Sequence, residues 1–107
     1  MQSNNMWKKI SPQEVEEKVT KGIGVQLIDV REPEEYASGR IVGSKLIPLS
    51  NFVERTNEID AEEEVICICR SGNRSAKACE YLSFIGFNNV NNMDGGMLEW
   101  KGDLEKN

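Results

Sequence analysis

The stretch VICIC at residues 65–69 is an unbroken apolar run of strand length, and VQLIDV at residues 25–30 is a second, mostly apolar one. Short runs of this kind are typical of strands that are buried on both faces. An antiparallel sheet with one wet face would instead alternate polar and apolar residues. The two runs therefore predict an α/β fold with a mainly parallel central sheet.

The segments around these strands carry helix signals. Ser11, Pro12 and Glu14 supply an N-cap, a first-turn proline and a capping-box partner for a helix over 12–20. Ser75 is a suitable N-cap for a helix over 76–85, which Gly86 would end. We also expect a helical turn at 32–36, a short strand at 46–47, a capped helix at 50–56, a strand around Val90 and a helical segment at 97–100. This alternation predicts about four or five strands with helices on both faces of the sheet.

Size and charge limit the class of protein. The chain has 107 residues, and 13 Lys and Arg against 18 Asp and Glu give a formal net charge of −5 at pH 7. We therefore expect a single domain over residues 1–107, with no partner among nucleic acids or membranes. His is absent, which excludes histidine general bases and histidine metal ligands.

The chain has three cysteines, Cys67, Cys69 and Cys79. They lack the C-x-x-C spacing of zinc or dithiol sites, and residues 1–10 hold no apolar signal segment. We therefore expect a cytoplasmic protein with reduced thiols, without a metal or a cofactor. Cys67 and Cys79 fall in a buried strand and on an apolar helix face, where a free cysteine acts as a small hydrophobic residue.

The loop CRSGNRS at residues 69–75 follows a buried strand and precedes a helix. In open α/β sheets, ligands bind outside the carboxyl ends of the strands. Inward N–H groups, the helix N-terminus and two guanidinium groups would all favour a thiolate at Cys69. We predict that Cys69 is a nucleophile facing a concavity, with a small anion bound by Arg70, Ser71, Gly72, Asn73, Arg74 and Ser75. The alternative is a cysteine that only closes a tight turn.

Asp29 and Arg31 follow the end of the other apolar strand, at the same predicted edge of the sheet. We expect them to support the site. They could do so by bracing a loop or by contacting the substrate.

Three ordered motifs resemble those of rhodanese homology domains. The stretch LIDVREPEEYASGRIVGS at residues 27–44, followed by Ile47-Pro48-Leu49, resembles the first signature of the family. The loop at 69–75 resembles the active-site loop, and Gly95-Gly96-Met97-x-x-Trp100 resembles the C-terminal signature. The resemblance spans nearly the whole chain, from about residue 8 to residue 100. It departs from the family at Arg40, Val42 and Leu46, which stand where His, Pro and Asn are usual.

The resemblance implies a rhodanese-like fold and a single-domain thiosulfate sulfurtransferase. Cys69 would attack the outer sulfur of thiosulfate, or of another persulfide donor, and become a persulfide. Cyanide, a thiol or a sulfur-acceptor protein would then take that sulfur. Arg74 would be either a second anion ligand or a partner for a carboxylate such as Asp29 or Glu35.

Two other functions stay open at this point. Rhodanese-like modules also act as noncatalytic binding domains or as sulfur carriers for a protein partner. Cysteine phosphatases resemble rhodaneses in fold, but they place five residues between Cys and Arg. Only four residues separate Cys69 from Arg74, which argues against a phosphatase because the shorter loop encloses a smaller anion.

Overall fold

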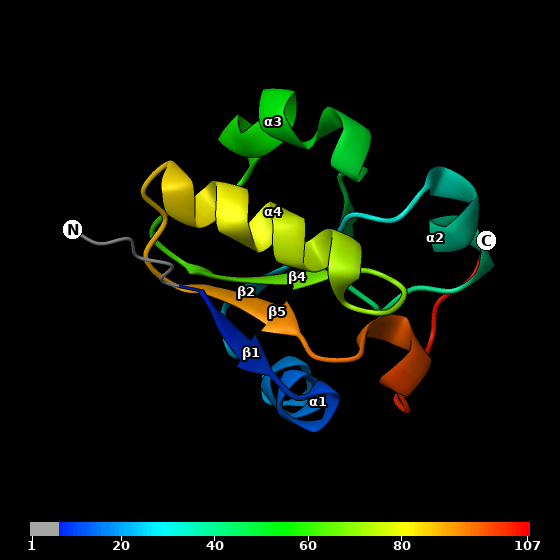
Figure 1. The fold of residues 1–107 in the computed structure, drawn as a ribbon. Coiled ribbons are helices and arrows are strands. Elements are labelled where there is room, and N and C mark those ends of the chain that lie inside the picture. Colours follow the sequence, from blue (N-terminus) through cyan, green and yellow to red (C-terminus); the bar gives the residue numbers. More distant parts are fainter. Residues whose placement is uncertain (1–6) are drawn as a thin grey trace.

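A computed structural model describes residues 7–107, which form a five-stranded sheet in the order β1-β5-β4-β2-β3 (Figure 1). All four strand pairings are parallel, so the predicted mainly parallel sheet is confirmed. The strands are β1 (Lys8–Ile10), β2 (Val25–Asp29), β3 (Lys45–Leu46), β4 (Glu64–Ile68) and β5 (Val90–Met93). Asp29 pairs in register with Ile68, so the loops after β2 and β4 start side by side.

Helices cover both faces of the sheet (Figure 1). On one face lie α4 (Asn73–Phe84) and α3 (Phe52–Arg55), and on the other lies α1 (Pro12–Thr20). At the carboxyl ends of the strands lie α2 (Pro33–Ser38) and the 3-10 helix η3 (Gly96–Glu99), while η1 (Leu49–Asn51) and η2 (Thr56–Glu58) flank α3. Within residues 7–107, no helix is long and apolar enough to cross a membrane.

The side chains of β4 divide the core into two layers. Cys67 and Cys69 pack with Leu82 and other residues of the α4 face. Ile66 and Ile68 pack with Val15 and other residues of the α1 face. Since successive side chains of a strand point to opposite faces, a strand between two helix layers must be apolar throughout. This is the physical basis of the apolar run at residues 65–69.

The structure differs from the sequence predictions in three elements. The edge strand β1 was not predicted, because only Ile10 of its three residues is apolar and buried. The helix expected at 50–56 is divided into η1, α3 and η2. The long helix α4 begins at Asn73, with Gly72 at its N-cap position. The prediction that Ser75 caps this helix is therefore wrong; its side chain turns to the sulfur of Cys69 instead.

Candidate active site

The sulfur of Cys69 lies against the loop that joins β4 to α4. Its Sγ accepts hydrogen bonds from the backbone N–H groups of Gly72 at 3.0 Å and Ser75 at 3.3 Å. The Ser75 hydroxyl is a third donor group within reach, with its Oγ 3.2 Å from Sγ and 2.5 Å from the side-chain oxygen of Asn92. Gly72 has a φ of +103°, which side-chain-bearing residues rarely adopt. These three donors, here called the cradle, converge on one sulfur atom and suit a negative charge.

Opposing effects set the pKa of Cys69. Burial raises it, whereas hydrogen bonds from the hydroxyl and amide of Ser75 and from the amides of Gly72 and Ser71 lower it. The net result is a pKa below the ordinary value of a thiol. For Cys67, a hydrogen bond with Cys79 and complete burial both raise the pKa. Cys67 and Cys69 are two residues apart on the chain, yet the surroundings of Cys69 favour its thiolate whereas those of Cys67 favour its protonated form.

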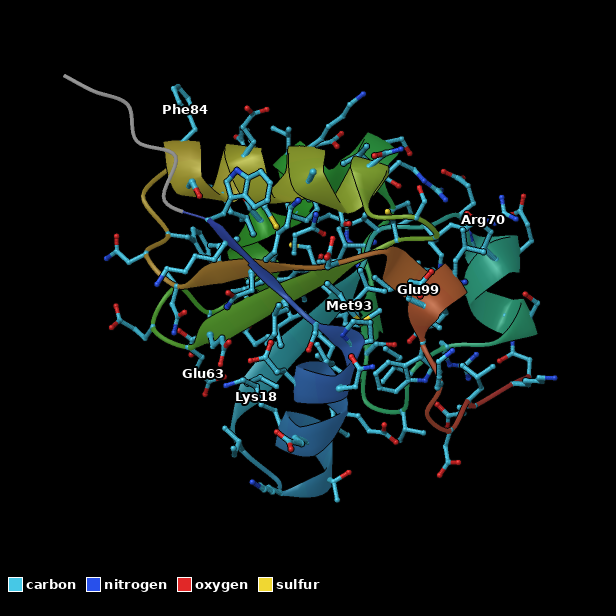
Figure 2. The ribbon with its side chains drawn as sticks, turned by 60° about the horizontal axis from the view of Figure 1, so that its bottom comes forward. Lys18, Glu63, Arg70, Phe84, Met93 and Glu99 are labelled. Carbon is cyan, nitrogen blue, oxygen red and sulfur yellow. The ribbon has the colours of Figure 1, made fainter. Side chains whose placement is uncertain are left out.

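Cys69 is nevertheless fully buried, with none of its surface exposed. This departs from the sequence interpretation, which places the sulfur before an open concavity. Arg70 and Ser71 are exposed at the tip of the loop, and Figure 2 shows Arg70 at the end of the molecule where α2 and η3 lie. The resting Cys69 side chain therefore offers no open surface to a substrate.

The 3-10 helix η3 holds this loop through its backbone. The N–H groups of Met97 and Leu98 donate to the carbonyl oxygens of Cys69 at 2.8 Å and Arg70 at 3.0 Å. A Cβ at Gly96 would lie 2.5 Å from the carbonyl oxygens of both loop residues. Only glycine permits this approach, so the Gly95-Gly96 motif belongs to the support of the active-site loop.

Two of the three predicted basic side chains, Arg74 and Arg31, are engaged in ion pairs. Arg74 holds Glu35 with two bonds, from Nη1 to Oε1 at 2.8 Å and from Nη2 to Oε2 at 3.0 Å, and lowers the pKa of Glu35 to about 2. Arg31 holds the buried Asp29 at 2.8 Å and also donates to the carbonyl of Gly39 at 2.8 Å. The first pair joins α4 to α2, and Arg31 links the end of β2 to the C-terminus of α2.

The remaining predicted residues are Arg70, Ser71 and Asn73. All three are exposed, and Arg70 has no ion-pair partner among residues 7–107. Arg70 is thus a cation at the loop tip that is free to meet an incoming anion. In the same part of the chain, no three His, Cys, Asp or Glu side chains converge to hold a metal ion.

Sequence reasoning missed Asn92, which is buried on β5. Its Oδ1 accepts from the Ser75 hydroxyl at 2.5 Å, and its Nδ2 donates to the carbonyl of Gly72 at 3.0 Å. The available signal was weak: two asparagines stand inside an otherwise apolar strand. A buried amide needs partners, but the sequence does not say which ones.

Comparison with known proteins places this geometry in a family. The rhodanese-like domain model matches residues 11–103. The chain is 41% identical over 98 residues to "Putative sulfurtransferase YtwF" of Bacillus subtilis, covering 92% of this chain and 94% of the relative. It is 33% identical over 95 residues to "Thiosulfate sulfurtransferase GlpE" of Ectopseudomonas mendocina, covering 89% and 85%. A rhodanese-like domain protein from Staphylococcus aureus superposes with a TM-score of 0.85 at 38% identity, covering 94% of this chain and 98% of that one. The chain therefore belongs to the rhodanese-like domain family and is a sulfurtransferase of the rhodanese type.

Proposed function

We propose that the protein transfers sulfane sulfur from thiosulfate to a thiophilic acceptor through a persulfide on Cys69. The Cys69 thiolate forms a bond to the outer sulfur of thiosulfate, the S–S bond of thiosulfate breaks, and sulfite leaves with the electron pair. Cyanide or a thiolate then attacks the outer persulfide sulfur, and the Cys69 thiolate leaves. Charge balances in both steps and no proton moves, so the absence of histidine from the sequence is no obstacle.

The cradle around Cys69 Sγ is the observation that carries this proposal. Its donors stabilise the thiolate, which is the form of cysteine that attacks sulfur. The same N–H groups can serve the negatively charged persulfide after transfer. Arg70, exposed at the loop tip, supplies a cation for the thiosulfate dianion. The name of the thiosulfate sulfurtransferase from Ectopseudomonas mendocina supports this choice of donor.

The arginine of the loop argues against phosphoryl transfer. A cysteine phosphatase needs its loop arginine to bind the phosphoryl group. In this protein, both terminal nitrogens of Arg74 are bound to Glu35. The short spacing from Cys69 to Arg74 and this ion pair therefore favour a sulfur-centred substrate.

The burial of Cys69 adds a step to the proposed mechanism. The exposed tip of the loop, Arg70 and Ser71, must shift before thiosulfate reaches the sulfur, because 0% of the resting Cys69 surface is exposed. Gly72 stays in place as a donor of the cradle. The tip is suited to such a movement: the side chains of Arg70 and Ser71 are exposed, and the loop contains a glycine. Its two ends are fixed by β4 and α4, so the movement is confined to the tip.

Mass spectrometry of the intact protein after incubation with thiosulfate tests the proposal. We expect an added mass of about 32 Da that maps to Cys69, is absent from Cys69→Ala, and is removed by cyanide with formation of thiocyanate. Cys79→Ala is the matched control and should still take up sulfur. A folded protein that gains no sulfur would overturn the proposal. A persulfide that passes to a protein thiol but not to cyanide would instead identify a sulfur carrier.

A further inference from the structure

We propose that Asn92 is a positioning residue that holds the two sides of the cradle together and thereby keeps Cys69 in its reactive form. The inference deepens the proposed function and rests on it. Among the described residues, the hydrogen bonds to Sγ come from Gly72 and Ser75 and not from Asn92. It binds instead to Gly72 and Ser75, the two residues whose N–H groups donate to that sulfur.

The sheet places Asn92 where it can do this. In the pairing of β4 with β5, Asn92 lies opposite Cys67. Side chains of paired residues in neighbouring strands project to the same face, and so do residues two apart on one strand. Asn92 is therefore on the same face as Cys69, under the loop, and only 4% of its surface is exposed.

The amide bridges two residues of the N-terminal turn of α4. Gly72 stands at the N-cap of α4, and Ser75 is within its first turn. Asn92 Nδ2 donates to the Gly72 carbonyl, which also accepts from the Ala76 N–H at 3.2 Å, and Oδ1 accepts from the Ser75 side chain. These bonds anchor the peptide that follows Gly72 and the side chain of Ser75, so they restrict both residues whose N–H groups face the sulfur. Because hydrogen bonds weaken steeply with misalignment, a small rotation at either residue would turn a donor away from the sulfur.

The Ser75 hydroxyl allows two mechanisms by which Asn92 affects the acidity of Cys69 to be distinguished. Its Oγ is within reach of both Cys69 Sγ and Asn92 Oδ1, but a hydroxyl carries one proton and donates to one acceptor at a time. If Asn92 only competed for that proton, removing its amide would make Cys69 more acidic. If Asn92 positions the cradle, removing the amide makes Cys69 less acidic, with or without the Ser75 hydroxyl.

The test is a pH titration of the ultraviolet absorbance of the thiolate, with Cys69→Ala as the blank for the other cysteines. This readout needs no reagent to enter the buried site and no turnover. We expect Asn92→Ala to raise the midpoint by about one pH unit, equal to about tenfold less thiolate well below the midpoint. The same rise should appear when Asn92→Ala is combined with Ser75→Ala.

Asn91→Ala is the matched control. Asn91 is the same residue type, adjacent on β5 and similarly buried, but it faces the α1 side and donates to Glu64. Its removal should leave the midpoint unchanged. If Asn92→Ala does not fold, as judged by urea denaturation, Asn92→Ser provides the same comparison with a smaller cavity.

The outcomes are distinguishable. A wild-type midpoint at or above that of a free thiol, about 8.5, would remove the basis of the proposed function itself. A low wild-type midpoint that Asn92→Ala leaves unchanged or lowers would overturn the role of Asn92 alone. So would a rise that disappears in the Ser75→Ala background, because the amide would then act only through the hydroxyl.

Discussion

Gly96→Ala tests whether the contact between η3 and the active-site loop is as tight as the structure shows. Gly96 has a φ of +63°, so any side chain there is strained by about 1–2 kcal/mol. The added Cβ would lie 2.5 Å from Cys69 and Arg70 backbone atoms, and relieving such overpacking costs about 1–3 kcal/mol more. We expect a total loss of about 2–5 kcal/mol, a large part of the roughly 5–15 kcal/mol that stabilises a small domain.

Urea denaturation measures this loss as a lower midpoint with an unchanged slope. Gly22→Ala is the control, because Gly22 has a similar φ of +68° but nothing within 4 Å of the added Cβ. It should show the backbone strain without the clash. We also expect Gly96→Ala to lower kcat/KM for thiosulfate, since η3 can no longer hold the loop carbonyls. Equal destabilisation by the two substitutions would refute the reasoning.

Three further predictions concern charge. Arg70→Ala should raise the KM for thiosulfate about tenfold or more with little change in kcat, because a charge-assisted hydrogen bond contributes about 1.5–3 kcal/mol; steady-state kinetics that show the reverse pattern would contradict this. Glu35→Gln removes a half-exposed ion pair with Arg74 and should cost about 1 kcal/mol at neutral pH. Because the pKa of Glu35 is lowered to about 2 in the folded protein, this stability is complete above the unfolded value of about 4.3 and disappears as the pH falls through about 2. Urea denaturation across that range should therefore show a flatter profile for the variant. Finally, kcat/KM should rise with pH to a plateau whose midpoint lies below that of a free thiol and shifts upward in Ser75→Ala.

The sequence predicted those features of the fold that depend on local patterns. The apolar runs at 25–30 and 65–69 identify strands buried on both faces, and Ser11 to Glu14 form the predicted capping box. The loop at 69–75 could be identified as a site because a buried strand, a glycine and two arginines stand together along the chain. In each case the deciding physical interactions join residues close in sequence.

The features that escaped prediction depend on contacts between distant segments. Asn92 reaches the loop across 17 to 20 positions, and the closeness of Gly96 to Arg70 exists only after η3 folds over the carboxyl ends of the strands. Ser75 is a good N-cap by residue type, but the left-handed Gly72 starts the helix earlier. The strand β1 forms because β5 offers a free edge to it, which no local pattern in residues 8–10 indicates.

An acidic protein can provide an anion site because charge acts locally. At physiological ionic strength the Debye length is about 8 Å, so exposed carboxylates on remote surfaces are largely screened. Figure 2 shows Glu63, in the acidic run before β4, far from Arg70 at the opposite end of the molecule. Two of the nearer carboxylates, Asp29 and Glu35, are each held by an arginine. The electrostatic environment of the Cys69 sulfur is therefore set by the N–H groups of the cradle and by Arg70. The net charge of −5 does not decide which ions this loop binds.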